Sequence, residues 1–147
     1  MINTPNLNYA RKEIQRLKAD GKIVMVQAQE DDFNRKMFES SDVDVVVGLE
    51  MHDRNDYLKQ RDSGLNEILC RLAKKNGIEI GIELKKIVKL SPKDKAIVLS
   101  RIMQNIRLCR RVGVRVVIMD SESFGKQELS GFLISLGAST KQVKESF

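Results

Sequence analysis

Four short, mostly apolar segments constrain the fold of this chain more than any other feature of the sequence. Runs of this kind are typical of buried strands, and strands that alternate with helices usually form a parallel sheet with right-handed crossovers. We therefore expect these segments to be neighbours in one parallel sheet covered by helices. They occupy residues 22–26, 43–47, 78–82 and 114–119.

Helix start and stop signals mark the stretches between these strands. The clearest helix begins at a cap formed by Asp62 or Ser63 and ends at residues 76–77. A longer helix begins at Ser91-Pro92 and ends at Gly113. Further helices are expected at 7–19, 31–40, 124–136 and 139–146, with a short helical turn after the third strand and a loop over Leu49–Arg61.

The length of 147 residues suits one domain, because such a chain can bury roughly two thirds of the surface it exposes when unfolded. There is no run of about 18 apolar residues and no signal-like opening, so we expect a cytoplasmic protein. Cys70 and Cys109 lie among apolar helix residues and are expected to be buried. Two thiols form neither a disulfide framework nor a four-ligand zinc site.

Positive charge is concentrated in the middle of the sequence. Residues 59–115 hold 15 Lys or Arg and five acids, whereas the two flanking parts together hold 11 bases and 15 acids. A basic middle suits a protein that presents one face to a polyanion, because neutralising phosphates releases counterions. The alternative is a set of solvated helix faces whose lysines confer only solubility.

Residues for catalysis by the chain itself are few. His52 is the only histidine, and a solvated loop histidine is the expectation for it. Glu83 and Asp120 lie near strand ends, where α/β active sites collect, and could bind magnesium, but no third ligand is evident. The main alternative is therefore a small, barrel-like, metal-dependent enzyme that handles phosphates with strand-end carboxylates. A protein-only scaffold is a third possibility.

Two features favour contact with the phosphates of a nucleic acid. Lys59 and Arg61 precede the predicted cap at 62–63, and a capped helix start with added cations is a plausible phosphate cradle. Arg107 and Arg111 lie four apart on one exposed edge of the long helix, and Arg101 can reach round from its first half. Two Tyr and five Phe are few for a single-strand reader that works mainly by stacking, so contacts with the backbone or the shape of a nucleic acid are favoured.

Three segments of this sequence resemble the ribonuclease P protein component 3 family, the archaeal counterpart of the thirty-kilodalton human subunit. They are Arg61-Asp-Ser-Gly-Leu-Asn and the helix after it, Ile78-Glu-Ile-Gly-Ile82, and the Arg-x-x-Gln-Asn-x-Arg-Leu pattern of residues 101–108. The resemblance runs from about Val43 to the end. The combination of the first and third segments is specific.

The resemblance implies a TIM-barrel-like α/β fold and an RNA-binding role beside a catalytic RNA, whose magnesium ions do the chemistry. The implied function is support of 5′-leader removal from precursor tRNA. Implied partners are ribonuclease P RNA, protein component 2 in a dimer of heterodimers, other ribonuclease P proteins and precursor tRNA. The chain itself would hold no cofactor or catalytic residue. The RNA-contacting residues it implies are Arg61, Ser63, Arg101, Gln104 and Arg107, with Lys59, Lys74 and Arg110 as further candidates.

The sequence also departs from the family pattern. Members usually open with a strand and have enough chain for a full barrel, whereas this sequence opens with a predicted helix and shows four strands. A closed eight-stranded barrel normally needs at least about 200 residues. We therefore expect an incomplete or distorted barrel of alternating parallel strands and helices, with its open edge covered by a partner or by the N-terminal helix.

Overall fold

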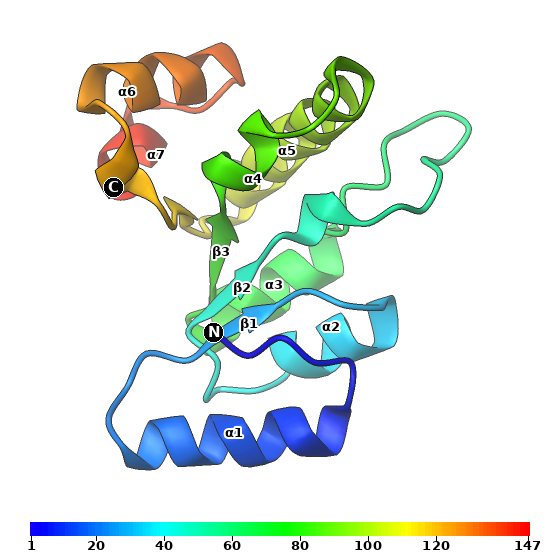
Figure 1. The fold of residues 1–147 in the computed structure, drawn as a ribbon, viewed down its shortest axis with the longest axis vertical. Coiled ribbons are helices and arrows are strands. Elements are labelled where there is room, and N and C mark those ends of the chain that lie inside the picture. The colour runs from blue at the N-terminus through cyan, green and yellow to red at the C-terminus, as the bar shows by residue number, and fades with distance from the viewer.

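In a computed structural model, which describes residues 1–147, four parallel strands lie side by side in one sheet (Figure 1). Their spatial order follows the sequence, and every neighbouring pair is parallel. The predicted parallel sheet is therefore confirmed, although each strand begins slightly later than predicted. The strands are β1 (Met25–Gln27), β2 (Val45–Val47), β3 (Glu79–Ile82) and β4 (Val116–Ile118).

Helices connect consecutive strands, as the alternation of the sequence predicts. The long helix is capped by Ser91, whose hydroxyl accepts a hydrogen bond from the Asp94 N–H, and it ends at Gly113. The predicted loop after β2 contains only one short 3-10 turn, η1 (Leu49–Met51). The helices are α1 (Leu7–Ala19), α2 (Asp31–Phe38), α3 (Glu67–Asn76), α4 (Leu84–Val88), α5 (Pro92–Val112), α6 (Lys126–Ser135) and α7 (Thr140–Glu145), with a second 3-10 turn, η2 (Ser121–Ser123), after β4.

The predicted start of α3 at residues 62–63 is wrong. Asn66 caps this helix, because its side-chain oxygen accepts the N–H of Leu69 at 2.9 Å. The residues before it turn inward through Gly64, which has a φ of +76° and lies against the backbone of Leu49. A Cβ at Gly64 would come within 2.3 Å of the Leu49 carbonyl oxygen, so only glycine fits there.

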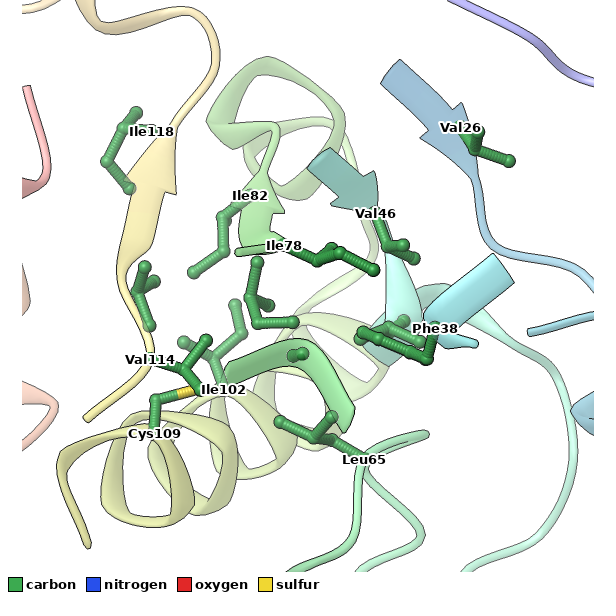
Figure 2. Close-up of a cluster of buried hydrophobic side chains, with 14 of the residues drawn as sticks. Val26, Phe38, Val46, Leu65, Ile78, Ile82, Ile102, Cys109, Val114 and Ile118 are labelled. Carbon is green, nitrogen blue, oxygen red and sulfur yellow. The ribbon is translucent and has the colours of Figure 1, made fainter. Parts of the chain in front are cut away.

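Alternate residues of the strands face the helices and form the main core. Figure 2 shows Val26, Val46, Ile82 and Ile118 on this side of the sheet, with Ile102 of α5 nearby. All five belong to one cluster of 30 buried residues. Since strand side chains alternate between faces, the residues between them point to the opposite face. There a groove of about 560 Å³ is lined in part by Met25, Glu79, Val117 and Met119.

Short terminal segments cover both edges of the sheet. Ile2 pairs in parallel with Val26 beyond β1, which corrects the expectation that the chain opens directly with a helix. Beyond β4, the Ile118 N–H donates to the carbonyl of Ser146 at 2.9 Å. The residue that pairs along the β1 edge is thus Ile2, whereas the sequence predicts α1 or a partner there. A parallel sheet whose strand order follows the sequence, with helices between consecutive strands, is the arrangement of a TIM-barrel wall, and four strands make only part of an eight-stranded barrel. The predicted barrel-like fold is therefore confirmed.

Candidate nucleic-acid interface

Arg101 holds the loop that follows β2. Its guanidinium donates to the carbonyl oxygens of Glu50 (3.1 Å), His52 (2.8 Å) and Arg54 (2.8 Å), and to the Asp56 carboxylate (3.1 Å). Only 4% of the residue is exposed. The prediction that Arg101 lies on the electropositive surface is therefore wrong, because every guanidinium nitrogen is already bonded inside the protein.

Asp56 connects this buried arginine to the exposed part of the loop. Its carboxylate also accepts hydrogen bonds from the Arg61 guanidinium (2.7 Å) and from the Asp62 N–H (2.8 Å). Burial by itself would raise the pKa of Asp56, but the hydrogen bonds from Arg61, Asp62 and Arg101 outweigh it and lower the pKa to about 2. The carboxylate thus fixes Arg61 at the surface through a charge that persists at any ordinary pH.

Of two ionisable residues in the predicted loop, Glu50 is buried and His52 is largely covered, which the sequence alone does not reveal. His52 has a side chain only 11% exposed, and its Nε2 lies 2.7 Å from the carbonyl of Asp62. That nitrogen must carry the proton to donate, and burial lowers the pKa of His52, so the ring has a structural role in holding the loop. The expectation of a solvated histidine is wrong. Glu50 is 1% exposed, and neither carboxylate oxygen has a hydrogen-bond partner.

Ser63 is also unavailable to RNA in this structure. Its side chain is buried and donates to the carbonyl of Leu65 at 3.1 Å, and the Ser63 backbone carbonyl accepts a hydrogen bond from the Asn105 side chain. The first turn of α3 carries Glu67, which pairs with Arg71 at 2.8 Å. The predicted phosphate cradle at this helix start is therefore wrong, because the start lies farther along the chain and carries negative charge.

The exposed cations of the loop and of α5 gather in one depression, which we call the basic groove. It has a volume of about 520 Å³, and none of its nine lining residues is acidic. Four of the eight predicted RNA contacts lie here: Lys59, Arg61, Gln104 and Arg107. Arg111 joins them, and the remaining lining residues are Gln60, Ser100, Met103 and Leu108.

The cations of the basic groove differ in how they are held. Arg61 is paired with Asp56, and Arg111 approaches Glu67 at 3.7 Å. Lys59 and Arg107 are exposed and take part in no ion pair. The groove therefore offers two unneutralised charges beside two arginines held in place by carboxylates, an arrangement that suits a chain of phosphates.

Lys74 and Arg110 lie outside the basic groove. The Lys74 ammonium donates to the carbonyl of Gly113 at 3.0 Å, and Arg110 donates to the carbonyl of Gly137 at 3.1 Å. Both side chains are exposed, but each donates to a backbone carbonyl just after the end of a helix. RNA contact by these two residues stays a prediction.

The carboxylates near the strand ends are engaged within the protein. Asp120 accepts the N–H groups of Leu84 and Lys85 at 3.0 and 2.8 Å, and Glu83 pairs with Lys86 at 2.8 Å. No group of three or more His, Cys, Asp or Glu side chains is placed to hold a metal ion. The enzyme alternative therefore has no metal-binding cluster here.

Cys70 and Cys109 are both fully buried, as predicted. No helix has the length and apolarity needed to cross a membrane.

Known proteins resemble this chain over most of its length. The ribonuclease P protein component 3 of Methanococcus maripaludis (strain C7) is 28% identical over 137 residues, which are 90% of this chain and 56% of the relative. The same component of Methanococcus vannielii is 27% identical over 140 residues, 92% of this chain and 58% of the relative. The chain thus spans little more than half the length of these curated relatives.

Solved structures show a similar fold. A chain in the cryo-EM structure of archaeal ribonuclease P with mature tRNA matches with a TM-score of 0.81 and 22% identity, over 98% of this chain and 61% of that chain. An uncharacterised protein matches with a TM-score of 0.58 and 14% identity, over 96% of this chain and 38% of that chain. The family described as RNase P subunit p30 matches residues 1–138. This confirms the resemblance found in the sequence, and the chain belongs to the RNase P subunit p30 family.

Proposed function

We propose that this protein is an RNA-binding subunit of ribonuclease P that supports removal of 5′ leaders from precursor tRNA in the cytoplasm. The observation that carries this proposal is the basic groove, where cations from two separate parts of the chain meet without an acid among them. Such a surface gains free energy from each phosphate it neutralises, because bound counterions are released. Membership of the RNase P subunit p30 family indicates that the groove would act within a ribonuclease P particle.

The basic groove and the family membership also support a set of proposed partners. They are ribonuclease P RNA, precursor tRNA, ribonuclease P protein component 2 in a dimer of heterodimers, and other ribonuclease P proteins. The relatives from Methanococcus carry the name of a ribonuclease P component, and one solved neighbour comes from an archaeal ribonuclease P with mature tRNA. In this function the RNA and its magnesium ions cleave the substrate, and the chain positions RNA.

Reconstitution tests the proposed function directly. We expect the chain alone to leave precursor tRNA intact and, together with component 2, to stimulate cleavage by the catalytic RNA. The measurement is the rate of leader removal with all components and with this chain omitted. Specific leader removal by the chain after rigorous removal of RNA would contradict the proposal and favour the enzyme alternative. Equal rates with and without the chain would contradict it as well.

Replacing Arg107 or Lys59 with alanine should weaken RNA binding through electrostatics alone. If each side chain makes one phosphate contact, each substitution should lower the slope of log affinity against log salt by about one unit, with little change in sequence preference. Thermal melts should agree with wild type, because changes at solvated positions usually stay within about 0.5 kcal/mol. The measurement is a salt titration of binding to ribonuclease P RNA.

Arg11→Ala is a matched control for these two variants. Arg11 is exposed on α1 and lies outside the basic groove, so its removal changes net charge equally without touching the groove. If Arg107→Ala and Lys59→Ala keep the wild-type slope and affinity, or change them no more than Arg11→Ala does, the groove is a solvated face and not an RNA site.

A further inference from the structure

A second cavity opens directly beside the basic groove. It has a volume of about 410 Å³, within the range of about 300–1,000 Å³ that is usual for ligand pockets. The two cavities share Gln60, Arg61, Gln104 and Leu108 among their lining residues, so they are adjacent. We call the second cavity the side pocket. It is bounded by the loop after β2 on one side and by α2 and α3 on others.

The side pocket differs in charge from the basic groove. Asp31, Asp32, Asp62 and Glu67 line it, while Arg35 and Arg61 are its cations. Asp31 is paired with Arg54 at 3.0 Å and Glu67 with Arg71, so these acids are partly neutralised by residues around the pocket. A phosphate is therefore favoured in the groove and disfavoured in the pocket. A group that offers N–H donors is better suited to the pocket.

An aromatic ring and amide side chains complete the side pocket. Tyr57 lines it and is 59% exposed, which leaves much of the phenol ring open to a ligand. Gln60 and Gln104 lie where the pocket meets the groove and can donate and accept hydrogen bonds. These are the groups with which proteins bind bases that are free of the helical stack: an aromatic face for stacking and polar groups for the base edge.

We propose that the two cavities together bind one unpaired nucleotide of an RNA, with its flanking phosphates in the basic groove and its base in the side pocket against Tyr57. This inference rests on the proposed function, since it takes the basic groove to be the RNA contact. The base is one that carries an amino group, because Asp32 is exposed in the pocket and can accept from it.

The occupant is an unpaired nucleotide and not part of a duplex. A base inside a helix is covered by its neighbours and would have to leave the stack to enter a pocket, which costs a few kcal/mol, least for a base that is already unpaired. Tyr57 is the only aromatic residue that lines either cavity. The site therefore accommodates one base at a bulge or loop, whereas a longer single strand would need several stacking platforms.

Two RNA hairpins of equal length test this inference with the full chain. One carries a single bulged 2-aminopurine, which is fluorescent and has an amino group, and the other is fully paired. We expect wild type to bind the bulged hairpin about 5- to 150-fold more tightly, the range for one base stacked on an aromatic side chain, and to change the fluorescence of the probe. Tyr57→Ala should abolish the preference while leaving affinity for the paired hairpin unchanged, and Tyr57→Phe should retain it.

Controls separate this inference from the proposed function. Leu58→Ala removes a neighbouring side chain that is 98% exposed and lines neither cavity, so it should change nothing. Arg107→Ala should weaken binding to both hairpins by the same factor. Equal binding of both hairpins by wild type, or a preference that Tyr57→Ala leaves intact, overturns the inference and leaves the proposed RNA contact standing. If a folded wild-type chain binds neither hairpin, both proposals are overturned.

Discussion

Replacing Arg101 with alanine is expected to lower the free energy of unfolding by about 3–5 kcal/mol, the usual effect of removing one partner of a buried ion pair. The substitution leaves Asp56 without one of its cations and leaves three loop carbonyls without a donor. Since whole domains are stable by only about 5–15 kcal/mol, the variant should be close to unfolding. Urea denaturation followed by circular dichroism measures the change.

Two variants sharpen this test. Arg101→Lys keeps the charge but cannot reproduce the planar set of donors, so its loss of stability should be substantial and smaller than that of alanine. Arg107→Ala removes an exposed arginine of the same helix and should change the free energy of unfolding by no more than about 0.5 kcal/mol. A stable Arg101→Ala variant with a lower salt slope in RNA binding would show that Arg101 contacts phosphates after all.

The fold was largely predictable because its signals are local. Short apolar runs such as residues 43–47 define strands, and caps such as Ser91 define helix ends, over distances that the sequence displays directly. The start of α3 was the exception. Asp62, Ser63 and Asn66 are all good capping residues, and the choice among them depends on the inward turn at Gly64, which packs against Leu49. That contact is visible only after folding.

The basic groove could be predicted in part, because exposed charges four apart on a helix share a face. The burial of Arg101 could not be inferred from its charge, but its position on α5 indicates it. On α5, buried residues recur at 98, 101, 102, 105, 106 and 109, so Arg101 and Asn105 occupy places in the apolar stripe. A polar residue inside such a stripe usually bonds to a buried partner. In this protein the partner of Arg101 is the loop that supplies Lys59 and Arg61.

Glu50 illustrates a feature that the sequence does not reveal. It follows β2 at the start of a segment that is polar from residue 52 onward, and nothing in the neighbouring residues distinguishes it from an exposed acid. Its burial results from packing between the strand ends and α5, to which η1 is adjacent. Burial is the main cause that raises the pKa of Glu50, which reaches about 7. The nearby Glu83 carboxylate adds to the rise, whereas the polar backbone of Glu50 itself, Lys86 and Arg101 reduce it.

Replacing Glu50 with glutamine should therefore change how stability depends on pH. In the unfolded chain the carboxyl titrates near pH 4.5, and in the folded protein near pH 7. Between these values the folded state binds the extra proton, so the wild-type free energy of unfolding falls as pH rises through this window. Above pH 7 the buried carboxylate is ionised, at a cost on the order of 3 kcal/mol. Glutamine cannot ionise and avoids that cost.

The decisive quantity is the difference in unfolding free energy between Glu50→Gln and wild type at pH 8, minus the same difference at pH 4. We expect a relative gain for the variant on the order of 3 kcal/mol. Any constant cost of burying an amide cancels in this subtraction, and so do the titrations of groups that both proteins share. Glu122→Gln, at an exposed acid, should give a value near zero. A value near zero for Glu50→Gln as well would mean that water or a counterion reaches this carboxylate, and that Glu50 is not the buried, unpartnered group that the packing of η1 against α5 makes it.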